Sequence, residues 1–275
     1  MGSETGLTAA GRTDTGRKRP HNEDAIRLEP GLGLLVLADG MGGYSAGEVA
    51  SQIAVDTVVS TVRNASPLER GDRLLEEAFQ KANRSILDTA RSDPERQGMG
   101  TTIVACLFRR RRVTIGHVGD SRAYRLRRGR MEQLTTDHSL NQELLDRGYY
   151  TRMEARRAGN RHVITRALGV RESVDVSLRE ESVAEGDLFM LCSDGLTDMM
   201  DDHSIRYALE SRSGALEELA DSLVDRANEL GGRDNISVIL TLAGAGSASE
   251  RRPLLSRFRD RLQKLFRREG NPADI

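Results

Sequence analysis

Four short acidic blocks, widely separated along the chain, constrain the fold more than any other feature. They are Asn22-Glu23-Asp24, Asp39-Gly40-Met41-Gly42-Gly43, Ser193-Asp194-Gly195 and Asp234-Asn235. Each carboxylate stands next to a turn-forming residue, and each block taken alone is an ordinary turn or loop. Together they predict separate loops that converge on a hard divalent cation, because magnesium and manganese prefer carboxylate and carbonyl oxygens as ligands. The pattern favours a metal-dependent enzyme.

Length and composition limit the number of domains. The chain has 275 residues, 37% of them hydrophobic, which suits the core of one large domain with a short appendage. It has no run of about 18 apolar residues that would span a bilayer, and residues 1–20 lack the apolar segment of a secretory signal. We therefore expect a cytoplasmic protein. Its two cysteines, Cys106 and Cys192, stand in apolar runs, which predicts buried thiols rather than a disulfide or a thiolate metal site.

A change in composition after Leu242 predicts the end of the main domain. We expect residues 1–242 to form the globular body, residues 243–250 to be a small-residue linker and residues 251–275 to be an appended tail. The whole chain has 41 basic and 42 acidic side chains, a net charge of −1. Residues 243–275 hold eight basic and four acidic side chains, so the body is acidic.

The tail has the pattern of a basic amphipathic helix. From residue 251 to 269, eight basic side chains accompany only two acidic ones. Its apolar side chains share one helical face: Leu254, Leu255, Phe258, Leu262, Leu265 and Phe266. Such a helix can lie on an anionic membrane surface, dock onto a protein partner or fold back onto the acidic body. All three destinations stay open on the sequence alone.

Hydrophobic periodicity predicts an antiparallel arrangement of strands layered with helices. Residues 32–39 form a continuous apolar run that should be a buried strand with Asp39 at its end. A helix should follow over residues 45–62, with Ser45 and Glu48 as a capping box, and a second over 68–91. The remaining expected elements are hairpins pairing 101–108 with 113–118 and 122–126 with 131–134, strands near 174–178 and 188–192, helices within 205–230 and a strand over 236–242.

The acidic blocks also suit a dinuclear centre. Such a centre needs one carboxylate that bridges two ions, further carboxylates that neutralise them and open positions for water. Asp39, Asp194 and Asp234 supply the charges, and Asp39 is the natural bridging ligand. Gly40 lets its own carbonyl approach a metal closely, because glycine has no side chain to obstruct the approach.

Six ordered motifs make the chain resemble a known family. They are Arg19-x-x-Asn22-Glu23-Asp24, Asp39-Gly40-Met41-Gly42-Gly43, Gly98-Met99-Gly100-Thr101-Thr102, Val118-Gly119-Asp120-Ser121-Arg122, Ser193-Asp194-Gly195-Leu196 and Asp234-Asn235. In this order they resemble the metal-dependent Ser/Thr protein phosphatases of the 2C type, especially the bacterial branch. The resemblance implies an α+β fold, a four-layer α-β-β-α sandwich with two central antiparallel sheets flanked by helix pairs and with the metals at one edge of the sheets.

The resemblance assigns the metal ligands motif by motif. Asp39 corresponds to the bridging ligand, and Asp194 and Asp234 correspond to ligands of the first ion. The Gly40 carbonyl corresponds to a ligand of the second ion. The implied cofactors are two Mn²⁺ or Mg²⁺ ions, with a third in bacterial relatives.

Further roles follow from the same resemblance. Glu23 and Asp24 would hold metal-bound waters, and Asp120 would bind the third ion together with Asp194. Arg19 resembles the clamp that holds the substrate phosphate, a role that suits a guanidinium because it can hold two phosphate oxygens at once.

The implied reaction is hydrolysis of a phosphoserine or phosphothreonine monoester by direct attack of a metal-bridging water. Neither cysteine lies in a phosphate-cradling loop, so the covalent thiolate route of tyrosine phosphatases has no visible apparatus. The expected partners are phosphoproteins, among them a bacterial Ser/Thr kinase and its substrates. The alternatives are a pseudophosphatase that binds phosphoproteins as a signalling module, and a phosphatase dedicated to anti-sigma-factor pathway proteins.

One residue departs from the pattern of eukaryotic relatives. They carry a histidine, proposed to protonate the leaving alkoxide, where this chain has Met41. Methionine cannot donate a proton, so we expect the proton to come from water on a metal, with the ion at Asp120 as the hypothesis.

Two other segments bear on substrate choice. Residues 136–169 match a flap that varies among relatives and lies beside the active site, and His138, His162 and Arg166 are its candidate site residues, since flap mobility can tune substrate choice. Residues 109–112 are four consecutive arginines at a predicted hairpin tip. Without interleaved aromatic residues and within an acidic body, they predict a solvated turn and no nucleic-acid binding.

Overall fold

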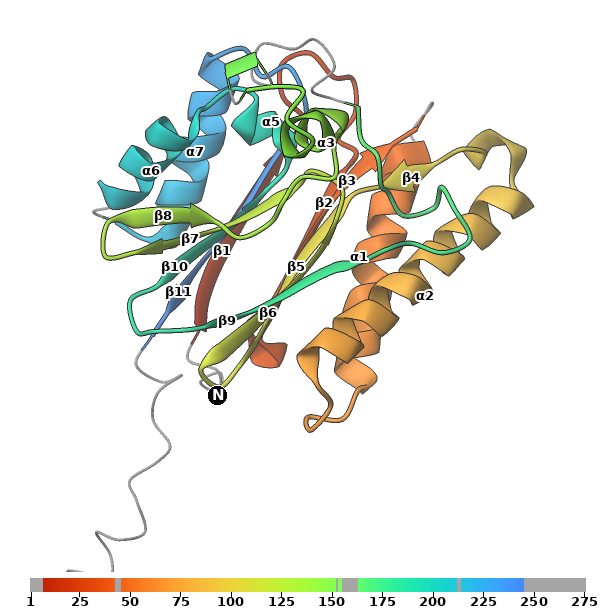
Figure 1. The fold of residues 1–275 in the computed structure, drawn as a ribbon, viewed down its shortest axis with the longest axis horizontal. Helices are drawn as coiled ribbons and strands as arrows, with labels where there is room; N and C mark the ends of the chain where they lie inside the picture. The colour runs from red at the N-terminus through yellow and green to blue at the C-terminus, as the bar shows by residue number, and fades with distance from the viewer. Residues whose placement is uncertain (1–6, 43–45, 152, 155–162, 212–213, 245–275) are drawn as a thin grey trace, which may run out of the picture.

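The computed structural model describes residues 7–42, 46–151, 153–154, 163–211 and 214–244. Two antiparallel sheets stack face to face at the centre, with α1 and α2 covering one outer face and α6 and α7 covering the other (Figure 1). This is the four-layer α-β-β-α sandwich that the sequence predicted.

One sheet has the strand order β1-β11-β10-β7-β8, and the other β2-β3-β5-β6-β9, with β4 paired to β3 outside that path. The strands are β1 (Leu7–Asp14), β2 (Asp24–Glu29), β3 (Leu34–Met41), β4 (Gly100–Thr101), β5 (Ile103–Arg109), β6 (Arg112–Val118), β7 (Arg122–Arg127), β8 (Arg130–Gln133), β9 (Ser177–Ser182), β10 (Leu188–Cys192) and β11 (Ile236–Ala243). The helices are α1 (Ala46–Asn64), α2 (Gly71–Ser92), α3 (Leu140–Asp146), α5 (Asp194–Thr197), α6 (Asp202–Glu210) and α7 (Leu216–Glu229), with short 3-10 turns at Pro30–Leu32 and Pro94–Arg96.

Strand β3 shows why the central strands are continuously apolar. Side chains alternate between the two faces of a strand. Leu34, Val36 and Ala38 pack against α1 and α2 in one core cluster. Leu35 and Leu37 pack into a second cluster between the sheets. Both faces are buried, so the strand cannot carry the alternating polar pattern of a half-exposed sheet.

The expected helices and most of the expected strands are present. Helices α1 and α2 lie within two or three residues of the predicted bounds, both hairpins form, and β11 runs one residue past the expected boundary, with Ala243 paired to Leu7. Ser45, half of the predicted capping box, lies outside the described residues. Among the described residues no helix is both long and apolar enough to cross a membrane.

The predicted strand near residues 174–178 was misplaced. Strand β9 begins at Ser177, and its residues are partly or fully exposed and mainly polar, SLREES. Its position is fixed by antiparallel pairing with β6, in which His117 lies opposite Ser177 and Arg112 opposite Ser182. A polar edge strand carries little hydrophobic periodicity, so the sequence pattern could not locate it.

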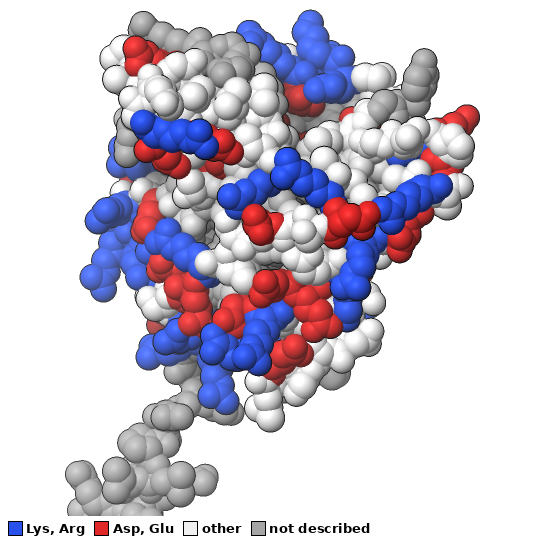
Figure 2. Space-filling view, turned by 45° about the vertical axis from the view of Figure 1, so that its right-hand side comes forward, with Lys and Arg blue, Asp and Glu red and all other residues white. Residues whose placement is uncertain are grey.

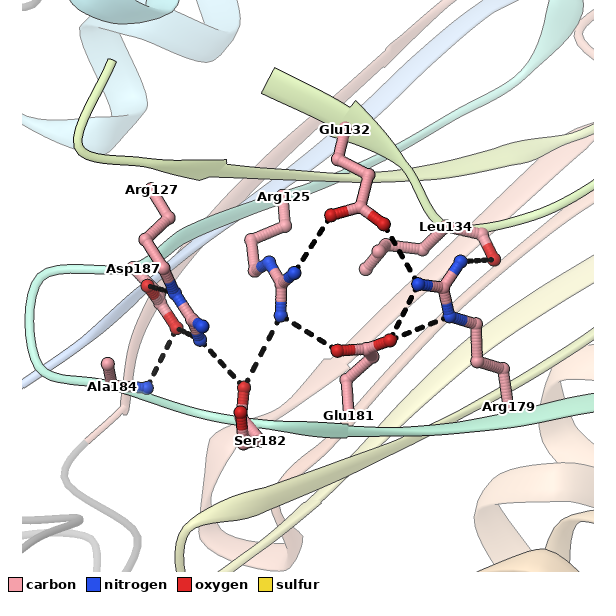
Figure 3. A network of polar contacts seen from close by, with 9 residues as sticks. All are labelled: Arg125, Arg127, Glu132, Leu134, Arg179, Glu181, Ser182, Ala184 and Asp187. Carbon is pink, nitrogen blue, oxygen red and sulfur yellow. Dashed lines mark hydrogen bonds and ion pairs between the residues drawn. The ribbon is translucent and has the colours of Figure 1, made fainter. Parts of the chain in front are cut away.

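Polar side chains link the edges of the two sheets. Arg125 on β7 and Arg179 on β9 each contact both Glu132 on β8 and Glu181 on β9, which forms a closed ring of alternating charges (Figure 3). Arg125 is only 8% exposed. The ring joins β7 and β8 of one sheet to β9 of the other.

Candidate metal centre

Asp39 lies near the end of β3 and is held by its own backbone. Its N–H donates to Thr102 Oγ1 at 3.1 Å, and its carbonyl accepts from the Thr102 N–H at 2.9 Å and from Thr101 Oγ1 at 2.8 Å. Thr102 Oγ1 also lies 2.8 Å from Ser121 Oγ. The Gly-Thr-Thr and Asp-Ser-Arg motifs therefore support the acidic block at Asp39 from behind.

Asp24 lies directly opposite Asp39 in the register of β2 and β3. Its Oδ2 accepts a hydrogen bond from Ser193 Oγ at 2.8 Å. Ser193 also donates its N–H to the Ser237 carbonyl at 3.1 Å. These bonds bring the start of α5, where Asp194 is the first residue, to the edge of the sheet that carries Asp39.

Gly40 occupies a position where no side chain fits. A Cβ there would lie 2.1 Å from the Gly47 carbonyl oxygen and 2.6 Å from that of Glu23. The Gly40 N–H donates to the same Glu23 carbonyl at 3.1 Å. The close approach places the Glu23 loop, the end of β3 and the start of α1 against one another.

Asn235 ties the N-terminal loop to this centre, a role that the sequence analysis did not assign. Its side-chain amide donates to the carbonyls of Thr15 and His21, both at 2.9 Å, and its Oδ1 accepts from the Glu23 N–H at 2.8 Å. The side chain is 4% exposed. The Asp-Asn block identified the residue, but only the tertiary structure reveals that its amide positions the loop from Arg19 to Glu23.

Arg19 and the predicted metal-site residues other than Asp24 line two adjoining clefts, whereas Asp24, His138 and Arg166 line neither. The first encloses about 400 Å³ and is lined by Arg19, Glu23, Asp39, Gly40, Met41, Gly42, Ile164, Asp194, Gly195, Asp198, Met199, Arg233 and Asp234. The second, of about 930 Å³, extends toward α6 and contains Asp120. Asp194 lines both clefts, so Asp120 is separated from Asp39 but shares a wall with Asp194.

Burial and mutual repulsion shape the electrostatics of these carboxylates. Removal from water is the main cause, and the nearby Asp194 carboxylate a further one, of a pKa raised to about 7 for Asp24 and to about 8 for Asp120. The pKa of Asp39 is raised well above its usual value, first by burial and then by Asp24 and Asp194. Bringing these groups together as anions is costly without a compensating positive charge.

The donor set fits a divalent cation. Asp24 Oδ1 and Asp120 Oδ1 are buried and have no hydrogen-bond partner among the described residues. Among the described residues, no three His, Cys, Asp or Glu side chains are already arranged as a group that could hold a metal ion. The carboxylate oxygens nonetheless come from separate segments, carry like charges and include unsatisfied lone pairs. Mg²⁺ and Mn²⁺ prefer ligands of this kind.

Arg19 reaches this centre from the N-terminal loop. Its Nη2 donates to Asp234 Oδ2 at 2.7 Å, and its side chain is 51% exposed. Asp234 Oδ1 also accepts the N–H of Asn235 at 2.9 Å. The predicted clamp and a predicted metal ligand are therefore paired with each other at the mouth of the first cleft.

The three candidate flap residues lie in different environments. His138 is buried and stacks on His117, with 4.6 Å between ring centroids. Its Nδ1 accepts the Gly119 N–H at 3.1 Å, and its Nε2 lies 2.9 Å from Ser177 Oγ. Burial, followed by the neighbouring His117, lowers its pKa to about 3, so it is neutral at physiological pH.

His138 therefore holds the loop before Asp120 through the Gly119 N–H. Arg166 is exposed. His162 lies outside the described residues. Met41 lines the first cleft, as its place in the Asp-Gly-Met-Gly-Gly block required.

The two cysteines are buried and free, as predicted. Burial raises the pKa of both thiols far above the physiological range. Neither lines the two clefts. A thiolate nucleophile is thus excluded for these positions on both geometry and protonation.

Comparison with known proteins agrees with this geometry. A family model described as "Protein phosphatase 2C" matches residues 13–241. The serine/threonine phosphatase stp of Listeria innocua is 38% identical over 235 residues, which cover 83% of this chain and 93% of that protein. The serine/threonine protein phosphatase PstP of Mycobacterium tuberculosis is 40% identical over 237 residues, 85% of this chain and 44% of PstP.

Solved structures show the same relationship. The crystal structure of the Mycobacterium tuberculosis phosphatase PstP/Ppp superposes with a TM-score of 0.82 at 37% identity, covering 86% of this chain and 99% of that one. A structure of the PstP catalytic domain in complex with two manganese ions has a TM-score of 0.78 at 37% identity, covering 86% and 98%. On the family match, the identity and the shared fold, the chain belongs to the protein phosphatase 2C family.

Proposed function

We propose that this protein is a metal-dependent serine/threonine protein phosphatase that hydrolyses phosphoserine and phosphothreonine in proteins. The observation that carries the proposal is the convergence at one sheet edge of carboxylates from four separate acidic blocks, where burial and like charge raise the pKa of Asp39 and Asp24. A site of this kind is stabilised by divalent cations and then attracts a phosphate dianion.

Six groups would hold the two principal ions directly or through water. Asp39 would bridge them, Asp194 and Asp234 would bind one, and the Gly40 carbonyl would bind the other. Glu23 and Asp24 would hold coordinated waters. When bound, the ions polarise a water molecule for attack and neutralise the phosphate oxygens.

The chain's own residues would orient the substrate around that centre. Arg19, at the mouth of the cleft, would break its hydrogen bond with Asp234 and donate two parallel hydrogen bonds to phosphate oxygens. This geometry suits the planar guanidinium. With both thiols buried and protonated, no cysteine forms a phosphoenzyme. The phosphoester bond would break by direct attack of water.

The choice of ion and the number of ions belong to the proposal as well. Mn²⁺ and Mg²⁺ both accept oxygen ligands in octahedral geometry. A third ion would bind Asp120 together with Asp194. This assignment is supported by the fact that both residues line the same cleft. The buried Asp120 Oδ1, which has no hydrogen-bond partner among the described residues, favours a cation at this position.

The proposed partners are phosphoproteins, in particular a bacterial Ser/Thr kinase and its substrates. The visible face in Figure 2 intersperses positive and negative side chains. Residues 251–269 would dock onto a membrane surface or a protein, separated from the catalytic domain by the linker of residues 243–250. All but the first residues of the linker, and the whole tail, lie outside the described residues.

The decisive experiment measures phosphate release from a phosphothreonine peptide with Mn²⁺, with chelator and with the Asp39→Asn variant. Calorimetric Mn²⁺ binding gives a second readout, and Asp221→Asn on α7, outside both clefts, is the matched control. We expect release to vanish with chelator and in Asp39→Asn but to persist in the control. Wild-type protein that binds Mn²⁺ without turnover would instead favour the pseudophosphatase alternative.

A further inference from the structure

Arg233 stands at the rim of the catalytic cleft. It lies on the turn between α7 and β11, directly before Asp234, and lines the same cleft as Asp39 and Arg19. Gly40, on the floor of that cleft, is buried, whereas Arg233 is exposed. Its guanidinium is therefore closer to solvent than the carboxylates that would bind the ions.

The two arginines of this cleft differ in their partners. Arg19 is paired with Asp234 at 2.7 Å. The guanidinium of Arg233 makes no hydrogen bond or ion pair with any of the described residues, although acidic side chains line the same cleft. A guanidinium has five N–H donors and readily binds carboxylate or phosphate through two parallel hydrogen bonds. As far as the described residues go, Arg233 thus offers an anion-binding group without a partner beside the reaction centre.

The backbone beneath Arg233 is fixed. The Gly232 carbonyl accepts the Arg17 N–H at 2.7 Å, and the Gly232 N–H donates to the Ala227 carbonyl at 3.1 Å. Gly232 has φ +48°, and a Cβ there would lie 2.5 Å from Asn228 Oδ1. Because the turn is held on both sides, only the side chain of Arg233 has to be ordered when an anion binds, which lowers the cost of binding.

We propose that Arg233 is a specificity-determining residue that binds an anionic group of the substrate protein close to the phosphorylated residue. This inference rests on the proposed phosphatase function. With the reacting phosphate at the cleft floor, the substrate chain must cross the rim, and each residue of an extended chain advances about 3.3–3.6 Å. A negative group about one to three residues from the reacting one comes within reach of Arg233.

The anionic group has two sources, the carboxylate of Asp or Glu and the phosphate of a second phosphoresidue. Both accept two parallel hydrogen bonds from a guanidinium. A second phosphate carries more charge than a carboxylate, so it should give the larger preference.

The test compares kcat and KM for four substrates at saturating Mn²⁺. Three are phosphothreonine peptides of equal length, with neutral flanks, with glutamate flanks or with a second phosphothreonine, and the fourth is an aryl phosphate. The proteins are wild type, Arg233→Ala, Arg233→Lys and Arg84→Ala. Arg84 is an exposed arginine on α2 that lines neither cleft, so its removal matches the change in net charge away from the site.

We expect Arg233→Ala to raise KM about two- to fivefold for the two anionic peptides, the range of an exposed ion pair, with kcat unchanged. The neutral peptide and the aryl phosphate should be unaffected, Arg233→Lys should retain part of the preference, and added salt should shrink it. Loss confined to the doubly phosphorylated peptide assigns the site to phosphate, and equal loss on both assigns it to anions in general. Binding of a non-hydrolysable phosphonate peptide should weaken in parallel.

Two results would overturn the inference. In one, Arg233→Ala matches Arg84→Ala on every peptide. In the other, all four substrates lose kcat together, which places Arg233 at the reacting phosphate. Failure of the proposed phosphatase function would give a different result. Wild-type protein would then release no phosphate even from the neutral peptide and the aryl phosphate, and the inference about Arg233 would be wrong as well.

Discussion

At the scale of single residues, the metal centre depends on side chains that position the loops around its predicted ligands. Asn235 is next to a predicted metal ligand, yet its side chain makes three hydrogen bonds to the loop that carries Arg19 and Glu23. His138 was predicted as a flap residue, and its buried ring accepts the Gly119 N–H. Residue type and spacing identified both positions, but the direction of each side chain decided its role.

Replacing Asn235 should loosen the N-terminal loop. We expect Asn235→Ala to lower the free energy of unfolding by about 1–3 kcal/mol, because backbone groups of Thr15, His21 and Glu23 lose the hydrogen bonds to the buried Asn235 amide. Mn²⁺ affinity, measured by calorimetry, should fall as well. Asn235→Asp keeps the acceptor for Glu23 but adds a negative charge among carboxylates, so metal-free Asn235→Asp should be the less stable of the two. Unchanged unfolding in both variants would show that the loop is held by other contacts.

Asp120 is the residue on which leaving-group protonation is expected to depend. Met41 lines the cleft and cannot donate a proton, so we infer that the proton reaches the leaving oxygen from the Asp120 side of the site. Asp120→Ala should therefore reduce kcat for a phosphothreonine peptide more than kcat for an aryl phosphate, whose leaving group needs little protonation. Equal losses on the two substrates, compared in parallel kinetic assays, would count against this role.

At the scale of elements, charged groups replace apolar packing where β8 and β9 face each other. The ring of Arg125, Glu132, Arg179 and Glu181 joins the two sheets through bonds of 2.8–3.0 Å (Figure 3). Next to it, Arg127 pairs with Asp187 through two bonds of 2.7 and 2.6 Å. The same polar character that joins the sheets hid β9 from the sequence analysis.

Arg125 should be the most important member of the ring for stability, because it is the most buried. We expect Arg125→Ala to lower the free energy of unfolding by about 1–3 kcal/mol, since Glu181 keeps only Arg179 as a partner. Urea unfolding measures the change. Arg206→Ala, which removes an exposed pair with Glu210 on α6, should cost less than about 0.5 kcal/mol. Similar small losses in both variants would show that the ring contributes little.

At the scale of the whole molecule, the sandwich is stable enough to hold several buried carboxylates together. Three cores stabilise it, two between a sheet and its helix pair and one between the sheets. The packing of these cores offsets the repulsion among the buried carboxylates until cations neutralise them. Stability and metal binding should therefore respond to pH together.

The metal-free protein should become less stable as pH rises from about 5 to 8. Asp24 and Asp120 have folded-state pKa values of about 7 and 8, above the ordinary value of 3.8, so the folded state binds more protons than the unfolded state in this window. Stability then falls with rising pH. Saturating Mg²⁺ or Mn²⁺ should raise Tm, more at pH 8 than at pH 5.5, because protons compete with the cation.

Asp24→Asn supplies the matched variant for that experiment. Its metal-free form should lose part of the pH dependence, because one of the buried titrating groups is gone. Asp221→Asn, on the exposed surface of α7, should leave the slope unchanged. Thermal unfolding in chelator across this pH range measures all three proteins, and a wild-type Tm that rises with pH would contradict the assignment.

The sequence by itself determined the layered antiparallel fold, both hairpins, the buried cysteines and the set of acidic residues, since periodicity and short motifs encode these locally. Only the tertiary structure decided that Asp24 faces Asp39, that Asn235 holds the N-terminal loop, that His138 braces the Asp120 loop and that β9 starts at Ser177. Each of these depends on contacts between segments distant in the chain. A side chain's partners across such distances are set by strand register and loop packing, which local sequence patterns do not specify.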